Sequence, residues 1–141
     1  MRYHFRIHIG RFLWAECIEL QGCVTQGSTG ANLQKNMHEA VNLYLEEPDS
    51  STVIFPSPAR IPKRRNVVEV EEDPRVAFAM QLRQLRLRGK LTQKEAARKL
   101  GLKNIYSYQR LERKGNPSLV TIKKVKTLFP GLSLDAVLGD M

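Results

Sequence analysis

Seven side chains that suit contacts with nucleic acid lie close together in the second half of the chain: Lys103, Asn104, Tyr106, Ser107, Gln109, Arg110 and Arg113. Arginine can bond guanine bidentately in the major groove, at about 1–3 kcal/mol of discrimination, so Arg110 is the first choice for base reading. Asn104 or Gln109 could address adenine, and Tyr106 a thymine methyl group or a phosphate. Lys103, Arg113 and the neighbouring Lys114 would add attraction that does not depend on base sequence. The alternative for each exposed cation is a role in surface solvation alone.

The elements that must position these side chains are predicted from the spacing of residues 91–117. Gln93, Ala97 and Gly101 stand at four-residue steps, which indicates a polar helix start, a small residue at a helix crossing and a glycine in a left-handed turn. Thr92 and Glu95 have the spacing of a capping box. Four residues of the next helix are expected to face inward: Ile105, Tyr108, Leu111 and Glu112.

This pattern resembles the helix-turn-helix of Cro/repressor domains, which bind DNA. Tyr108 falls seven residues after Gly101, whereas six is the family spacing. We expect the extra residue to enlarge the turn around Lys103 and Asn104 and to leave the helix from Ile105 onward intact. At the start of the preceding helix, Thr92 and Gln93 are expected to clamp phosphate. The alternative is a helix pair of the kind found in many all-helical domains.

The resemblance also assigns two charged residues to the scaffold. A helix is expected from about residue 75 to residue 88, and Arg86 lies seven residues before Gln93. In Cro/repressor domains that position commonly pairs with an acidic residue near the end of the third helix, which Glu112 resembles. The resemblance therefore implies an ion pair between Arg86 and Glu112, and it excludes Arg86 from the DNA contacts.

Charge divides the chain into two unlike halves. Residues 1–73 contain 8 Lys and Arg against 10 Asp and Glu, a net charge of −2, while residues 74–141 contain 15 against 4, a net charge of +11. A basic half of this kind attracts phosphate, and its affinity for nucleic acid should fall steeply with salt. Two domains are expected, residues 1–72 and residues 73–141.

The basic half should end in two further elements. Residues 118–128 are expected to form a helix capped by Ser118, with Val120, Ile122, Val125 and Leu128 as its apolar residues. A short apolar terminal element follows, and we interpret it as a dimerisation surface, because reading two half-sites requires two copies. Packing onto the same domain is the alternative for its four apolar residues: Leu132, Leu134, Val137 and Leu138.

In the first half, Tyr3, Phe5, Ile7 and Ile9 alternate with polar residues, which predicts a strand with one buried face. After a turn at Gly10, residues 11–18 are predicted to pair back as a second strand, and residues 24–26 to form a short third. Thr29 is a candidate N-cap for a helix over residues 30–46. One face of that helix is apolar: Leu33, Met37, Ala40, Val41 and Tyr44. A last strand is predicted over residues 67–71.

Residues 3–72 resemble the N-terminal domain of the HicB antitoxin family. An aromatic-rich hairpin leads to a bend, a helix and a pair of prolines whose residues carry the resemblance: Leu20, Gln21, Gly22, Cys23, Thr25, Gly27, Thr29, Asn36, Glu39, Ala40, Pro56 and Pro58. The family usually has acidic residues at the helix start, where this chain has Gly30, Ala31 and Asn32. The resemblance implies an α+β chain, with a small partial RNase H-like domain of antiparallel sheet plus helix followed by an all-α helix-turn-helix domain.

The two resemblances together imply an antitoxin that neutralises a small HicA-like, mRNA-cleaving toxin and represses its own operon by binding operator DNA as a homodimer or a tetramer. No residue of the toxin-binding surface is assigned. Trp14 is a candidate anchor, and its alternative is a core or half-core aromatic of the hairpin. The alternative function is a stand-alone repressor whose N-terminal domain senses a ligand or oligomerises.

Enzymatic and metal-binding functions are not expected. True RNase H-like nucleases hold metal ions with clustered carboxylates, whereas the acidic residues here are dispersed: Glu16, Glu19, Glu39 and Glu46. Cys17 and Cys23 are expected to be small, reduced core residues, and His4 and His8 to lie at the surface or at an interface. The sequence indicates no cofactor. Charges near the N-terminus and the lack of a long apolar run predict a cytoplasmic protein that does not cross a membrane.

Overall fold

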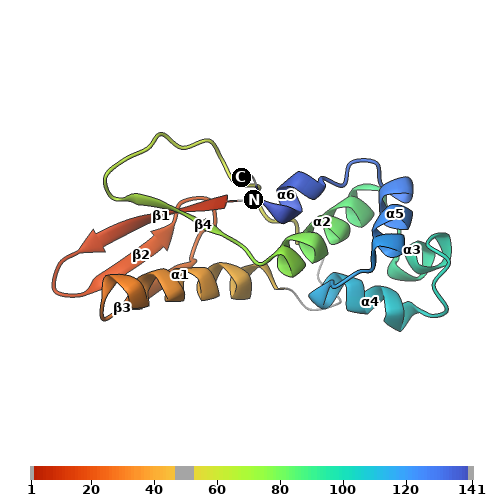
Figure 1. Cartoon of the computed structure of the whole chain (residues 1–141), viewed down its shortest axis with the longest axis horizontal. Coiled ribbons are helices and arrows are strands. Elements are labelled where there is room, and N and C mark those ends of the chain that lie inside the picture. Colours follow the sequence, from red (N-terminus) through yellow and green to blue (C-terminus); the bar gives the residue numbers. More distant parts are fainter. Residues whose placement is uncertain (1, 47–52, 140–141) are drawn as a thin grey trace. The chain divides into compact units, whose positions relative to one another are not determined.

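The computed structural model describes residues 2–46 and 53–139, which form two compact units (Figure 1). Residues 2–45 and 55–73 make up most of the first unit, and residues 74–138 most of the second. The first unit combines a β-sheet with one long helix, and the regular elements of the second are all helices, so the chain is α+β.

The sheet of the first unit is antiparallel and has four strands in the order β3-β2-β1-β4. Its strands are β1 (Arg2–Ile9), β2 (Leu13–Cys17), β3 (Val24–Gly27) and β4 (Val67–Glu71). The alternation in the sequence gives the sheet one apolar face, on which Phe5 pairs with Cys17 and Tyr3 with Val70. β2 begins two residues later than predicted, because the hairpin between β1 and β2 includes residues 11 and 12. An antiparallel sheet with one helix is therefore confirmed for this unit.

Helix α1 (Gly30–Leu45) covers the apolar face with four buried side chains, Leu33, Met37, Val41 and Leu45. Thr29 caps its start, since the Thr29 hydroxyl accepts a hydrogen bond from the Asn32 N–H at 3.1 Å. The chain passes from β3 into α1 at Gly27, where a β-carbon would lie 2.5 Å from the backbone nitrogen of Leu33. Only glycine permits this close approach of strand and helix.

The position of His4 corrects a prediction. His4 was expected at the surface, but it is 6% exposed. Its Nδ1 lies 2.8 Å from a carboxylate oxygen of Glu19, and its backbone N–H donates to the same carboxylate at 2.9 Å. The backbone N–H of Ala59 donates to Glu19 as well, at 3.1 Å. The segment around Ala59, which follows Pro56 and Pro58, is thereby held against the His4–Glu19 pair.

The polar face of the sheet, opposite α1, carries His8 and Trp14. The two rings are paired across β1 and β2 and stack with their centroids 4.1 Å apart. Glu16 on the same face accepts a hydrogen bond from His8 at 3.1 Å. Trp14 is half-buried in this stack and lies outside the core between sheet and helix. Cys17 and Cys23 are buried free thiols, as predicted.

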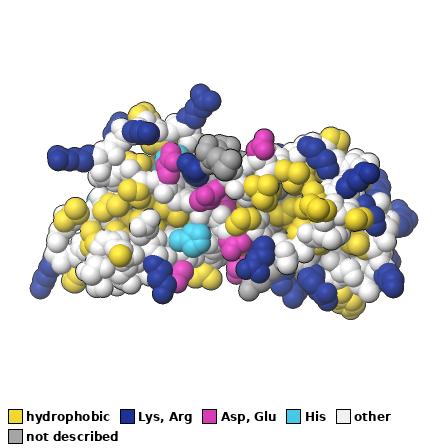
Figure 2. Space-filling model, viewed as in Figure 1, with side chains coloured by type: hydrophobic (Ala, Val, Ile, Leu, Met, Phe, Trp, Pro, Cys, Tyr) yellow, Lys and Arg dark blue, Asp and Glu magenta, His cyan; other side chains and the backbone are white. Residues whose placement is uncertain are grey.

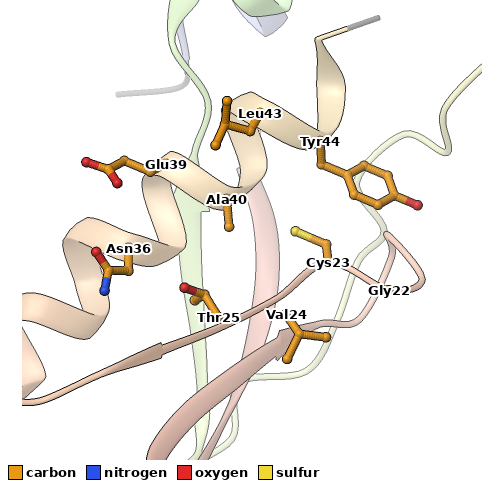
Figure 3. A pocket seen from close by; sticks show the side chains of 9 residues that line it. All are labelled: Gly22, Cys23, Val24, Thr25, Asn36, Glu39, Ala40, Leu43 and Tyr44. Carbon is orange, nitrogen blue, oxygen red and sulfur yellow. The ribbon is translucent and has the colours of Figure 1, made fainter.

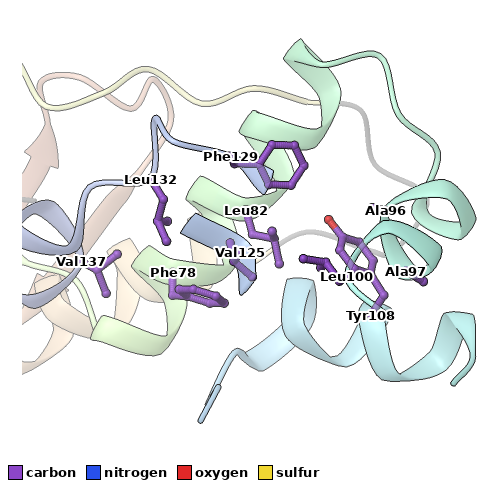
Figure 4. Close-up of a cluster of buried hydrophobic side chains, with 10 residues drawn as sticks. All are labelled: Phe78, Leu82, Ala96, Ala97, Leu100, Tyr108, Val125, Phe129, Leu132 and Val137. Carbon is purple, nitrogen blue, oxygen red and sulfur yellow. The ribbon is translucent and has the colours of Figure 1, made fainter. Parts of the chain in front are cut away.

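The second unit consists of α2 (Pro74–Arg88), α3 (Gln93–Lys99), α4 (Ile105–Lys114), α5 (Leu119–Leu128) and α6 (Leu134–Leu138). Figure 4 shows the apolar core that these helices enclose. Phe78 and Leu82 come from α2, Tyr108 from α4 and Val125 from α5. Ser118 caps α5 as predicted, because its hydroxyl accepts from the Thr121 N–H at 3.2 Å.

The apolar residues of the last two helices divide between core and surface. Leu132 and Val137 are buried in the core of their own unit, which corrects the prediction that they lie on a dimerisation surface. Of the four apolar residues named for α5, Ile122, Val125 and Leu128 lie on its packed side, and Val120 is 64% exposed. The apolar side chains exposed on α5 and α6 are Leu119, Val120, Leu134 and Leu138.

The end of α2 allows a stability prediction. Lys90 has φ = 56°, a left-handed conformation that glycine adopts without strain. The Leu91 N–H donates to the Arg86 carbonyl at 3.1 Å and the Lys90 N–H to the Leu87 carbonyl at 3.0 Å, so the turn is a Schellman motif. Lys90→Gly is expected to raise the free energy of unfolding by about 1 kcal/mol, as measured by urea denaturation.

The matched control for Lys90→Gly is Gly101, which ends α3 in the same kind of turn at φ = 70°. Gly101→Ala should lower the free energy of unfolding by about 1 kcal/mol. A Lys90→Gly variant that is less stable than the parent chain would show that the side chain of Lys90 contributes more than the backbone strain costs.

Candidate nucleic-acid interface

Helices α3 and α4 and the turn between them form the candidate site. The start of α3 has both hydrogen bonds of a capping box, from Thr92 to Glu95 and back. The end of α3 is a Schellman motif: the Gly101 N–H donates to the Arg98 carbonyl at 3.0 Å and the Leu102 N–H to the Ala97 carbonyl at 2.9 Å. Helix α4 begins at Ile105, the residue from which an intact helix was predicted.

Apolar packing fixes the inner sides of both helices. Ala96, Ala97 and Leu100 of α3 and Tyr108 of α4 are buried in the core of the unit, with Tyr108 fully inaccessible to solvent. Leu111 is half-buried against the same cluster. Because two small alanines face α4, the helices can approach closely, and the outer side of α4 has a fixed direction.

A buried hydrogen-bond network locks α2, α3 and α4 together around the Glu112 carboxylate. Arg86 forms an ion pair with Glu112 through Nε, and its Nη2 lies 3.3 Å from the second carboxylate oxygen. Tyr108 donates its hydroxyl hydrogen to Glu112 at 2.7 Å, and Gln93 donates its amide hydrogen at 2.9 Å. Arg86 and Glu112 thus stand where the resemblance placed them, as scaffold residues that do not face outward.

The pKa shifts of this network reflect its burial. Burial opposes the charged form of Arg86, but the hydrogen bond and the charge of Glu112 outweigh that effect and raise the pKa of the guanidinium. Burial, followed by the negative charge of Glu112, raises the pKa of the Tyr108 hydroxyl, which therefore remains a hydrogen-bond donor. Arg86 is charged and Tyr108 is neutral throughout the physiological pH range.

Thr92 and Gln93 were predicted to contact phosphate. In the structure their side chains form hydrogen bonds with other side chains and backbone groups of α3 and α4. The Thr92 hydroxyl both accepts from the Glu95 N–H and donates to the Glu95 carboxylate. The Gln93 amide bridges two helical positions, donating to Glu112 and accepting from the Gln109 Nε2 at 3.1 Å. In this structure both side chains hold the helices in place.

The two amides proposed to read adenine are also partly engaged. Asn104 caps α4: its Oδ1 accepts from the Ser107 N–H at 2.9 Å and lies 3.2 Å from the Ser107 hydroxyl. Gln109 is half-buried and donates to Gln93. Bidentate contact with adenine uses both ends of an amide, and Asn104 already uses its carbonyl oxygen for the cap, whereas Gln109 uses one of its two N–H groups and keeps its carbonyl oxygen.

The outward side of α4 retains the strongest base-reading candidate. Arg110 is exposed and has no partner among the described residues, Tyr106 is 71% exposed, and Arg113 is exposed at the next turn. Lys103 is exposed in the turn before α4. Figure 2 shows Lys and Arg side chains gathered over the helical unit. The structure therefore brings Lys103, Tyr106, Arg110 and Arg113 to the surface formed by the turn and α4.

Sequence reasoning missed two cations of α3. A groove of about 720 Å³ between α3 and the start of α4 is lined by three cations, Lys94, Arg98 and Lys103, and by one acidic residue, Glu95. Lys94 and Arg98 are four residues apart, so they occupy one side of α3, and that spacing in the sequence was the signal that could have identified them. The groove supplies three cations beside the helix that would enter the DNA.

Neither a membrane span nor a metal site is found in the described parts of the chain. Over residues 2–46 and 53–139, no helix has the length and apolar character needed to cross a bilayer. Within the same ranges, no three His, Cys, Asp or Glu side chains are grouped as ligands for a metal ion.

Compared with models of protein families and with curated proteins, the chain matches none.

Proposed function

We propose that this chain is a HicB-like antitoxin that binds and neutralises a small HicA-like, mRNA-cleaving toxin and represses its own operon by binding operator DNA. The observation that carries the proposal is the combination of two units in one chain. One unit carries an outward-facing helix with exposed cations, held by a buried network that joins α2, α3 and α4, and the other is a slightly acidic unit of sheet and helix.

The DNA-binding arm is residues 73–141. The net charge of +11 over residues 74–141 supports phosphate attraction, and the surface of Lys103, Tyr106, Arg110 and Arg113 supports contact within a groove. Operator reading by helix-turn-helix proteins usually requires two half-sites about one helical turn apart. The exposed apolar residues Leu134 and Leu138 support a homodimer, or a tetramer built from two such dimers.

The toxin-binding arm is residues 1–72. Its net charge of −2 over residues 1–73 suits a basic, RNA-binding partner, because opposite potentials accelerate association and favour the correct partner. Neutralisation by this arm involves no covalent chemistry and no cofactor.

Coexpression tests the antitoxin proposal. The small basic reading frame next to the gene should arrest growth when expressed alone, and the present chain should restore growth and co-purify with its product. A neighbour that is harmless alone, or toxicity that this chain does not suppress, would reject the antitoxin. Specific operator binding in the absence of such a neighbour would instead identify a stand-alone repressor.

The choice of Arg110 as base reader leads to a binding prediction. Arg110→Ala should weaken binding to the operator by about 1–3 kcal/mol and should weaken binding to random duplex much less. Fluorescence anisotropy with both duplexes at one salt concentration measures the two losses.

Lys103→Ala is the matched control for Arg110→Ala, since Lys103 is an exposed cation of the same surface. It should weaken binding to both duplexes about equally and lower the slope of log affinity against log salt by about 1. An equal loss on both duplexes for Arg110→Ala would make Arg110 a phosphate contact.

A further inference from the structure

The two edges of the sheet in the first unit differ in chemistry. Strand β4 forms one edge, and its edge-facing residues include Glu69 and Glu71, whose charges oppose pairing with another strand. Strand β3 forms the other edge and has no charged residue: its sequence is Val24, Thr25, Gln26 and Gly27. Uncharged edges are the ones open to strand addition.

The register shows which backbone groups β3 presents. The Cys17 N–H donates to the Cys23 carbonyl at 2.8 Å, so alternate residues from Cys23 onward bond to β2. Val24 and Gln26 therefore direct their N–H and C=O groups to the open edge. Asn36 of α1 donates to the Gln26 carbonyl at 2.7 Å. The Val24 N–H and C=O and the Gln26 N–H have no partner among the described residues.

A groove of about 480 Å³ runs beside this edge, between β3 and α1 (Figure 3). Cys23, Ala40 and Leu43 give it an apolar lining, and Glu39 places a carboxylate at its rim. Leu43 is 69% exposed and Val24 is 53% exposed, so an aliphatic side chain is accessible on each side of the groove. The β3 edge thus combines three features: backbone groups free for pairing, a groove for every second side chain of an added strand, and one negative charge.

We propose that β3 is the edge to which an extended segment of the partner toxin adds as a further strand, with an apolar side chain in the groove and a Lys or Arg beside Glu39. This inference rests on the proposed function, since the partner is the basic toxin. Charge favours the basic toxin over a second copy of this chain, because residues 1–73 have a net charge of −2 and self-association would bring two units of like charge together. A toxin strand that carries a Lys or Arg would instead be attracted by the Glu39 carboxylate and by the net charge of −2 over residues 1–73.

Val24→Pro tests the backbone pairing. Proline removes the edge-facing N–H and leaves the bonds to β2, which Val24 does not make, so an edge strand tolerates it. The affinity of the full-length chain for the purified product of the adjacent reading frame, measured by calorimetry, should fall at least tenfold. Val24→Thr keeps the N–H and should bind within about twofold of the parent chain.

Glu39→Lys tests the charge without altering the strand. It should also weaken toxin binding at least tenfold, whereas Glu69→Lys, at the opposite edge, should leave the affinity within about twofold. Hydrogen exchange at the Val24 and Gln26 amides should slow on binding to the parent chain. If Val24→Pro fails to fold, the affinity of Glu39→Lys and the exchange of the Val24 and Gln26 amides decide whether β3 binds the toxin.

The outcomes separate the inference from the function. Equal affinities for all variants with unchanged amide exchange would overturn the β3 edge and leave the antitoxin standing. Self-association that Val24→Pro abolishes would assign the edge to a second copy and overturn the inference. No binding of the neighbouring protein to the parent chain would overturn both.

Discussion

Glu112→Ala is expected to lower the free energy of unfolding of the helical unit by about 3–5 kcal/mol, because it leaves the buried charge of Arg86 without its partner. The side chain of Glu112 is fully buried, and that of Arg86 is 7% exposed. Alanine would also remove the acceptor for the Tyr108 hydroxyl and for the Gln93 amide. Since domains are stable by only about 5–15 kcal/mol, much of this unit should unfold at low urea concentrations, as followed by circular dichroism.

The double variant Arg86→Met with Glu112→Leu separates the stranded charge from lost packing. Buried ion pairs can often be replaced by apolar side chains of similar volume at little cost, so the double variant should be clearly more stable than Glu112→Ala. Arg110→Ala is the surface control and should change stability by no more than about 0.5 kcal/mol. A double variant as unstable as the single one would show that Glu112 stabilises the unit by other means.

The same network shows which features the sequence could predict. The cap at Thr92, the glycine at Gly101 and the start of α4 at Ile105 depend on residues close in the chain, and local sequence was sufficient for them. The pairing of Arg86 with Glu112 spans 26 residues and was available only through the resemblance to Cro/repressor domains. Local rules contain no information on contacts at that separation.

The features that the sequence did not reveal share a physical cause, which is that a side chain's partner comes from elsewhere in the fold. His4 alternates with apolar residues as a surface residue would, but Glu19 and the segment around Ala59 enclose it. Gln93 is a polar residue at the start of a helix, where phosphate contacts are common, and both ends of its amide form hydrogen bonds with side chains of α4. Leu132 and Val137 are apolar whether they pack against their own unit or a second copy, so periodicity could not choose between these arrangements.

Glu72 predicts a dependence of stability on pH that the sequence did not indicate. Its side chain is 2% exposed, and neither carboxylate oxygen has a hydrogen-bond partner among the described residues. Burial, with a further contribution from the charge of Glu71, raises the pKa of Glu72 from 4.5 to about 7. Between these two values the folded chain keeps a proton that the unfolded chain releases. The free energy of unfolding should therefore fall by about 3 kcal/mol as the pH rises from below 4.5 to above 7.

Glu72→Gln should remove this dependence, because the amide has the shape of the protonated acid and cannot ionise. At pH 8 the variant should be about 2–3 kcal/mol more stable than the parent chain, and near pH 4 the two should be about equal, as measured by urea denaturation across the pH range. Glu69→Gln is the control, since the side chain of Glu69 is 48% exposed and forms ion pairs with the exposed Arg2 and with His4. That variant should keep the parent slope between pH 4.5 and pH 7. If Glu72→Gln kept the slope as well, Glu72 would have to be ionised in the folded chain across the whole range, which would require a cationic partner or solvent at its carboxylate.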